Sequence, residues 1–357
     1  MTTGAHEHRA NSLLKHGIPL LTDIAELTQL FPDFLVISPP KTGSSWLAEN
    51  LRRHPCLFVP AFKEVKYFSA YCRMQDLAWY CGHFRDAQHR IKGEASPSYC
   101  LLPREQIQWV RTLMPSIKLI YLMREPVARA WSHAKHALKW REANFQASAC
   151  AIDDVTDSLW HENFHHEWTL ASGDYLGQLR RWLSVFPREQ VFVGFYESIT
   201  REPRKLLASI FDFLAVDPNP DFNHFPVFER INSGSDKELS PSLWAVLRAL
   251  WHERSCALRD FLNADLHLSV PEEWQVICKA NEPGNQQQRR TPAAAGKVFA
   301  REFDDAYLWA VLEHDPAALR LPIGANAYPN HLHSPIDDEG KGQMKLGEIV
   351  NKLLAPT

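Results

Sequence analysis

The stretch Phe31–His54, FPDFLVISPPKTGSSWLAENLRRH, decides the fold on which the rest of the chain builds. Its apolar run Phe34–Ile37 predicts a short buried strand, and the spacing of its later apolar side chains predicts a helix. We expect Ser44 and Ser45 to cap that helix. A strand, a tight loop and a helix bring backbone N–H groups and the positive end of the helix dipole to one point. The stretch therefore predicts an anion-binding loop, with an ordinary strand–helix corner as the plain structural alternative.

The loop between this strand and helix gathers donors around Lys41. A Walker phosphate loop needs glycine directly before the lysine and Ser or Thr directly after it. Here Pro39 and Pro40 precede the lysine, so an ATPase loop is not expected. The string PPKTGSSWL resembles instead the 5′-phosphosulfate loop of sulfotransferases that use 3′-phosphoadenosine-5′-phosphosulfate. The resemblance implies that this donor is held by Lys41, Thr42, Gly43, Ser44, Ser45 and Trp46.

A second anion site is expected where the predicted strand Lys118–Met123 ends at Arg124. The following helix carries Pro126 in its first turn and Ser132 two turns further on. A guanidinium binds two oxygens of a phosphate monoester at once, although a surface Arg–Glu pair is a common structural explanation. The run LIYLMREPVARAWSHAKH resembles the sulfotransferase 3′-phosphate signature, with Arg124 and Ser132 on its two binding positions. Two such sites suit a nucleotide with both 5′ and 3′ phosphates and do not suit ATP.

The segment Pro60–Phe68 places Glu64 between Lys63 and Lys66. In a partly desolvated pocket, such a carboxylate takes a proton from an acceptor while the lysines face developing negative charge. An exposed charge run fits the same spacing. The string KEVKYF followed by LAWY resembles the segment that carries the glutamate base in heparan-type glycosaminoglycan sulfotransferases and their bacterial relatives. The resemblance implies that Glu64 is the base, whereas Lys66 stands where many relatives have histidine.

Three further side chains are weaker candidates near this cleft. The segment GEASPSY, residues 93–99, resembles a family segment that lies along the cleft, and Ser96 there has a hydroxyl that can donate to ligand oxygens. We expect Lys63, Lys66 and Ser96 as substrate contacts, although loop serines are usually only structural. If Glu64 is not the base, His83 and His133 are the alternatives.

The run His161-Glu162-Asn-Phe-His165 is a literal HExxH and offers a competing interpretation as a zinc hydrolase. A zinc site needs a third ligand, and the residues that follow do not continue as the longer zinc-peptidase signature. Glu189 follows the HExxH run at a sequence distance that would suit a glutamate ligand, but it lies in a predicted turn rather than a clear helix. Large aromatic side chains repeat every four residues here and predict a face that packs down: Trp160, Phe164 and Trp168.

Composition bounds the class of protein. The 357 residues are enough to bury a full core, and a hydrophobic content of 45% with 23% charged residues is ordinary for a globular protein. A net charge of −3 argues against a general nucleic-acid binder. The seven cysteines contain no CxxC pair, which predicts neither a disulfide framework nor a zinc ribbon. No apolar leader and no run of membrane-spanning length are expected, which makes cytoplasmic the default location.

The alternation of strands and helices predicts an α/β domain of three layers, P-loop-like, with a central parallel sheet flanked by helices. The resemblance covers roughly residues 31–274. We expect an N-terminal arm at residues 1–30, a sulfotransferase domain at 31–275, and a linker with a C-terminal helical extension at 276–357. Loop Ile231–Leu239, which includes Lys237, is expected to cover the nucleotide.

The resemblance implies in-line transfer of a sulfuryl group from 3′-phosphoadenosine-5′-phosphosulfate to a hydroxyl or amine of a carbohydrate or small-molecule acceptor. The product would be adenosine-3′,5′-bisphosphate, and the scheme needs no metal. The other open alternatives are a nucleotide-dependent phosphotransferase and a nucleotide-binding module without catalysis. Expected partners are the donor and the acceptor, with a possible homodimer, no nucleic acid and no integral membrane segment.

Overall fold

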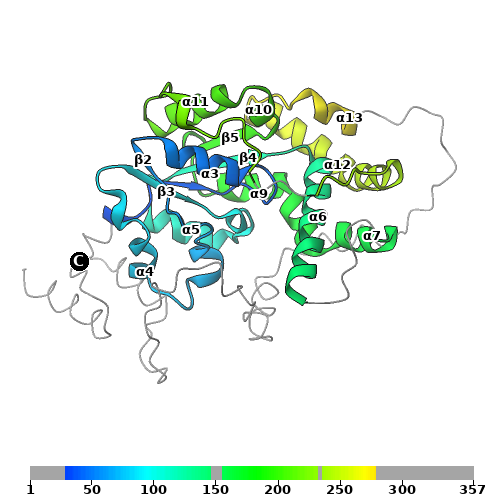
Figure 1. Ribbon diagram of the computed structural model, residues 1–357, viewed down its shortest axis with the longest axis horizontal. Helices are drawn as coiled ribbons and strands as arrows, with labels where there is room; N and C mark the ends of the chain where they lie inside the picture. The colour runs from blue at the N-terminus through cyan, green and yellow to red at the C-terminus, as the bar shows by residue number, and fades with distance from the viewer. Residues whose placement is uncertain (1–28, 146–154, 232–234, 279–357) are drawn as a thin grey trace, which may run out of the picture. The chain divides into compact units, whose positions relative to one another are not determined.

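The computed structural model describes residues 29–145, 155–231 and 235–278, and these residues belong to one unit that ends at Cys278 (Figure 1). Of the predicted N-terminal arm only residues 29–30 are described, and of the predicted linker and C-terminal helical extension only residues 276–278. Asn232, Ser233 and Gly234 of the expected covering loop also lie outside the described residues. The predicted domain boundaries stay predictions.

A parallel sheet of five strands forms the centre of this unit, in the order β2-β3-β1-β4-β5. Strand β1 pairs with β3 on one side and with β4 on the other. All strands stay parallel, but the direction in which successive strands are added across the sheet reverses beside β1. In open parallel sheets a ligand binds outside the carboxyl ends of the strands at such a reversal. The strands are β1 (Phe34–Val36), β2 (Leu57–Phe58), β3 (Ile91–Ala95), β4 (Lys118–Met123) and β5 (Val191–Phe195).

Helices cover both faces of the sheet, and alternate side chains of β4 show why. Ile120 and Leu122 are fully buried in a core with α3 and α11, whereas Tyr121 between them donates to Gln178 Oε1 of α9 at 2.5 Å. A strand sends successive side chains to opposite faces, so α11 and α9 lie on opposite sides of the sheet. Figure 1 shows α11 above the sheet and α5 below it. The predicted three-layer α/β fold with a central parallel sheet is confirmed.

The main helices connect or follow these strands, and shorter helices fill the remaining connections. A second core lies away from the sheet, where Trp131 of α6, Trp160 of α7 and Trp251 of α12 are buried together. The helices are α3 (Ser44–Arg53), α4 (Leu77–Gly82), α5 (Arg104–Leu113), α6 (Pro126–Phe145), α7 (Asp157–His165), α8 (Glu167–Gly173), α9 (Tyr175–Leu183), α10 (Glu197–Arg201), α11 (Pro203–Leu214), α12 (Pro241–Asp265) and α13 (Gln275–Cys278). In the described part of the chain, none of these helices has the length and apolarity to span a bilayer.

The predicted aromatic face around HExxH is only partly correct. Trp160 and Phe164 are buried, but Trp168 is 40% exposed. The helix that holds the first two ends at His165, and α8 begins with a new cap in which His166 Nδ1 accepts from the Trp168 amide at 3.3 Å. This break turns Trp168 off the shared face, so the period of four residues does not continue through it.

Candidate active site

The loop after β1 is held to the sheet by its own hydroxyls. Ser38 Oγ accepts from the Leu122 amide of β4 at 2.8 Å, and Thr42 Oγ1 donates to the Pro39 carbonyl at 2.7 Å. Lys41 has φ 72° and Gly43 has φ 94°, both in the left-handed region. The φ of 94° is strained for any residue with a side chain, and a Cβ at Gly43 would also lie 2.4 Å from Ile199 Cδ1, which favours glycine there. The loop therefore has one fixed shape at the carboxyl end of the central strand.

Helix α3 begins directly after this loop, so its N-terminus lies at the carboxyl edge of the sheet. The expected cap by Ser44 or Ser45 is wrong: Gly43 is the N-cap, and a glycine has no side chain with which to accept a hydrogen bond. Such a helix N-terminus favours an anion, because its N–H groups have no partner within the helix. The Trp46 side chain is buried and donates to the Val227 carbonyl at 3.0 Å, so its indole belongs to the core.

The structure brings the second predicted anion site against this loop. Arg124, the residue after β4, donates from Nη1 to the Lys41 carbonyl at 3.4 Å. Its guanidinium lies 4.3 Å from the centre of the Tyr196 ring, and the Tyr175 hydroxyl donates to its carbonyl at 2.9 Å. Because a ring and two backbone contacts fix Arg124, the fork of donors is preorganised beside the loop.

Four cations meet at this edge of the sheet. The pKa of Lys41 is lowered from its ordinary value, first by burial and then by the charges of Arg124, Lys135 and Lys63. Positive groups that repel one another form a site whose natural occupant is an anion with several charges. Sequence reasoning missed Lys135; its place one helical turn after Ser132 was the available signal.

Helix α6 contacts the loop that follows residue 234 through Lys135. Ser132 is half-buried, and Lys135 Nζ donates to the carbonyls of Ser235 at 2.5 Å and Lys237 at 3.1 Å. Trp131 Nε1 also donates to the Lys237 carbonyl, at 3.2 Å. The described end of the expected covering loop is therefore tied to the helix that follows Arg124.

The predicted base lies between two ammonium groups. Glu64 Oε2 lies 3.2 Å from Lys66 Nζ, and Glu64 Oε1 lies 3.7 Å from Lys63 Nζ. Lys63 Nζ also donates to Ser45 Oγ at 3.2 Å. One ammonium therefore joins the carboxylate to the first turn of α3. Burial lowers the pKa of Lys63, an effect that the nearby Glu64 charge opposes.

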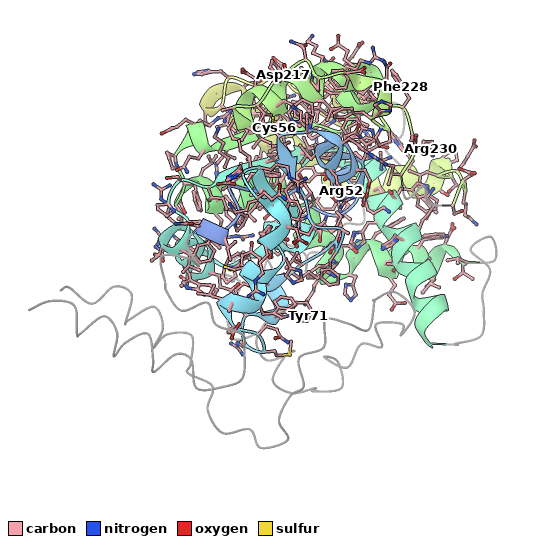
Figure 2. All side chains as sticks on the ribbon, turned by 60° about the vertical axis from the view of Figure 1, so that its left-hand side comes forward. Arg52, Cys56, Tyr71, Asp217, Phe228 and Arg230 are labelled. Carbon is pink, nitrogen blue, oxygen red and sulfur yellow. The ribbon has the colours of Figure 1, made fainter. Side chains whose placement is uncertain are left out.

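The segment before Glu64 is fastened to α3 by Arg52, which is labelled in Figure 2. Arg52 donates from Nε to the Val59 carbonyl at 3.2 Å and from Nη2 to the Pro60 carbonyl at 2.8 Å. These contacts fix the chain as it enters the Glu64 segment. The helix that supplies the anion site thus also sets the position of the candidate base.

Ser96 is buried rather than exposed to the cleft. Its hydroxyl accepts from the Lys66 amide at 2.9 Å and donates to Glu94 Oε2 at 2.6 Å. Sequence reasoning missed Glu94, because a glutamate inside the strand of GEASPSY gives no signal of burial. Burial raises the pKa of Glu94 to about 7, while hydrogen bonds from three hydroxyl groups oppose that rise.

The alternative bases and the zinc interpretation find no support. Burial, with the Arg129 charge, lowers the pKa of His133 to about 3, which leaves it a weak base. His83 is stacked on Phe62, with ring centres 5.4 Å apart, and burial lowers its pKa. His161 and His165 are exposed on α7. Across the described residues, no group of three or more His, Cys, Asp or Glu side chains is placed to hold a metal ion.

The family model described as "Sulfotransferase domain" matches residues 31–225, more than half of the chain. The chain belongs to the sulfotransferase family. A solved structure of a sulfotransferase from Alicyclobacillus acidocaldarius is 25% identical with a TM-score of 0.51, covering 69% of this chain and 99% of that one. The phosphotransferase alternative has no support from these matches.

Curated relatives carry sulfotransferase names. Heparan sulfate glucosamine 3-O-sulfotransferase 5 of Homo sapiens is 27% identical over 271 residues, covering 69% of this chain and 75% of the relative. The bifunctional heparan sulfate N-deacetylase/N-sulfotransferase 1 of Caenorhabditis briggsae is 27% identical over 211 residues, 54% of this chain. The membrane-associated sulfotransferase kil1 of Dictyostelium discoideum is 24% identical over 291 residues, 57% of this chain. The alignments span 24% and 61% of the last two relatives.

The expected cytoplasmic location is wrong. It was based only on the lack of an apolar leader and of a long apolar run, and the relatives contradict it, since kil1 is named as membrane-associated.

Proposed function

We propose that the protein transfers a sulfuryl group from 3′-phosphoadenosine-5′-phosphosulfate to a hydroxyl or amine of a carbohydrate. The observation that carries the proposal is the Lys63 ammonium, which contacts both Ser45 of the anion loop and the carboxylate of Glu64. It brings a polyanion site and a candidate base within the reach of one side chain. Family membership supplies the class of reaction.

The donor fits the distribution of positive charge at the edge of the sheet. Its 5′-phosphosulfate would lie on the amides of residues 42–45 and on the Ser44 and Ser45 hydroxyls, with Lys41 beside it. Its 3′-phosphate would lie on the Arg124 fork, with Ser132 as a second donor. The contact between Arg124 and the Lys41 carbonyl keeps the two ends of the site adjacent, as one nucleotide with two charged ends requires.

In the proposed reaction, an acceptor oxygen or nitrogen attacks sulfur and forms the new bond. The bond from sulfur to the bridging oxygen of the 5′-phosphate breaks, and adenosine-3′,5′-bisphosphate leaves. Glu64 takes the acceptor proton, and Lys41 and Lys63 stabilise the charge that grows on the leaving oxygen. Fixed cations beside a site of developing charge are the main source of such stabilisation, since they need no reorganisation during the step.

The acceptor that the relatives suggest is a heparan-type carbohydrate, because the names of several of them specify heparan sulfate. Lys63 and Lys66 flank the proposed base and would face an acidic sugar chain. We assign this activity to residues 31–275; an association into homodimers stays a prediction.

Transfer of label from a ³⁵S-labelled donor to heparan sulfate tests the proposal. The parent protein should label the polysaccharide, and Lys41→Ala and Glu64→Gln should each reduce kcat by at least about 100-fold. Glu202→Gln is the matched control, because Glu202 is an exposed carboxylate that also pairs with a lysine, 3.2 Å from Lys205 Nζ. Its rate should equal that of the parent. A Glu64→Gln variant with the parent rate would remove the base assignment, and a parent without transfer would refute the activity on this acceptor.

A further inference from the structure

A buried carboxyl group lies beneath the segment that carries Glu64. Glu94 stands near the carboxyl end of β3 and is 2% exposed. Three hydroxyl groups donate to it: Ser96 to Oε2 at 2.6 Å, and Tyr99 at 2.7 Å and Tyr80 at 3.1 Å to Oε1. A buried carboxyl group is costly unless it is hydrogen-bonded, so this arrangement needs a reason beyond the strand itself.

Two of these hydroxyls also accept from the backbone just after the candidate base. Ser96 Oγ accepts from the Lys66 amide at 2.9 Å, and the Tyr99 hydroxyl accepts from the Phe68 amide at 3.4 Å. A hydroxyl has one proton to donate. Because Glu94 receives that proton from each, the lone pairs of both hydroxyls are turned toward the two amides.

The amide of Lys66 is a position where the chain needs such support. Lys66 has φ 53°, a left-handed conformation that is strained for a residue with a side chain. Its ammonium contacts Glu64 Oε2 at 3.2 Å, so a change in its backbone moves a partner of the candidate base.

We propose that Glu94 is a positioning residue for Glu64: it orients the Ser96 and Tyr99 hydroxyls so that they hold the Lys66 and Phe68 amides and fix the segment that carries the base. The inference rests on the proposed function, in which Glu64 takes the acceptor proton. The groups that face Glu94 are Tyr80 from α4, Ser96 and Tyr99 from the turn after β3, and the Glu64 charge, which adds to the effect of burial on the Glu94 pKa.

The substitution Glu94→Gln keeps the size of the side chain and disrupts the pattern of hydrogen bonds around it. A carboxylate accepts on both oxygens, whereas an amide accepts on one side and donates on the other. Whichever way the amide is turned, its NH₂ group meets a hydroxyl that already accepts from the backbone. Ser96→Ala and Tyr99→Phe each remove one of the two links. Tyr80→Phe is the matched control, because Tyr80 donates to the same carboxyl but no backbone amide donates to its hydroxyl among the described residues.

Transfer kinetics with ³⁵S-labelled donor and heparan sulfate give the first readout. Glu94→Gln, Ser96→Ala and Tyr99→Phe should lower kcat about 10- to 100-fold, as expected for a base displaced by a fraction of an ångström, with an unchanged KM for the donor. Tyr80→Phe should stay within about threefold of the parent. A rise in the KM for heparan sulfate confined to Ser96→Ala would overturn the inference, since it would make Ser96 a substrate contact.

Amide hydrogen exchange of the whole protein gives a second readout that needs no activity. The Lys66 and Phe68 amides should exchange faster in Glu94→Gln than in Tyr80→Phe, while amides of β4 keep the parent rate in both. Equal exchange in the two variants overturns the inference even if the parent is an active sulfotransferase. If these amides exchange faster in Glu94→Gln but the parent transfers no sulfate, the proposed function is refuted. The role of Glu94 in holding the Lys66 and Phe68 amides is then still supported.

Discussion

Arg124 is the residue whose side chain should distinguish the donor nucleotide from its simpler analogues. Of the nucleotide's groups, the Arg124 guanidinium would contact only the 3′-phosphate. Arg124→Ala should therefore weaken binding of adenosine-3′,5′-bisphosphate by about 10- to 100-fold. Binding of adenosine 5′-monophosphate, which lacks that phosphate, should change by less than about threefold. Titration calorimetry measures both. Arg204→Ala, at an exposed arginine on α11, is the control and should change neither value. An equal loss for the two nucleotides would place Arg124 elsewhere in the site.

Glu94 also makes a residue-level prediction about stability. Burial raises its pKa from the ordinary 4.5 to about 7, so the folded protein binds more protons than the unfolded chain between these values. Protonated Glu94 therefore adds to the free energy of unfolding. This stabilisation is complete below pH 4.5 and is lost as pH rises through 7, a change of about 3 kcal/mol. The free energy of urea unfolding should therefore fall less in Glu94→Gln than in the parent between pH 5 and pH 8. A pH-independent difference between the two proteins would contradict the assignment.

At the scale of elements, the turn into α3 depends on Gly43. Gly43→Ala should destabilise the protein by about 1–3 kcal/mol, because φ is 94° and the added Cβ would lie 2.4 Å from Ile199 Cδ1. Gly82→Ala in α4 is the matched control: no atom lies within 4 Å of its added Cβ, and it should be neutral or slightly stabilising. Denaturant unfolding of both variants gives the comparison. Equal stabilities would show that α3 can begin without a left-handed glycine.

The elements with strong apolar patterns were predictable from the sequence. Strand Lys118–Met123 has the predicted bounds, because its continuous run of apolar side chains faces a core. Helix α6 was not foreseen to run to Phe145, since its later residues are polar and periodicity is weak there. The cap of α3 was missed because a serine beside a glycine is the usual cap, and tertiary packing against Ile199 selects the glycine.

The candidate site was predictable only where a local motif carried it. Lys41, Glu64 and Arg124 stand in strings with a recognisable order, and the structure brings Lys41 and Arg124 into contact. Ser96, which holds Glu94, and Lys135 instead contact partners far away in the sequence: the Lys66 amide and the Ser235 carbonyl. Such contacts depend on the strand order of the sheet, which no local pattern specifies.

At the scale of the whole molecule, charge is unevenly distributed. The chain has a net charge of −3, yet Lys41, Lys63, Arg124 and Lys135 share one edge of the sheet. Adenosine-3′,5′-bisphosphate should therefore stabilise the protein against heat. At about 100 times its Kd the gain is about 2.7 kcal/mol, or roughly 5–10 °C in Tm. At a fixed ligand concentration, 0.5 M NaCl should reduce the gain. A Tm that the ligand leaves unchanged would contradict the charge cluster as its site.

The double contact of Lys63 means that the two halves of the cleft compete for one ammonium. In the free protein that group is divided between Ser45 and Glu64. A nucleotide bound on the loop would attract the Lys63 ammonium toward its own negative charge and weaken the contact between Lys63 and Glu64. Glu64 would then keep its closer ion pair, to Lys66 Nζ at 3.2 Å, and lose part of its contact with Lys63. By thermodynamic reciprocity, whatever ties up the carboxylate must also change how firmly the nucleotide is held.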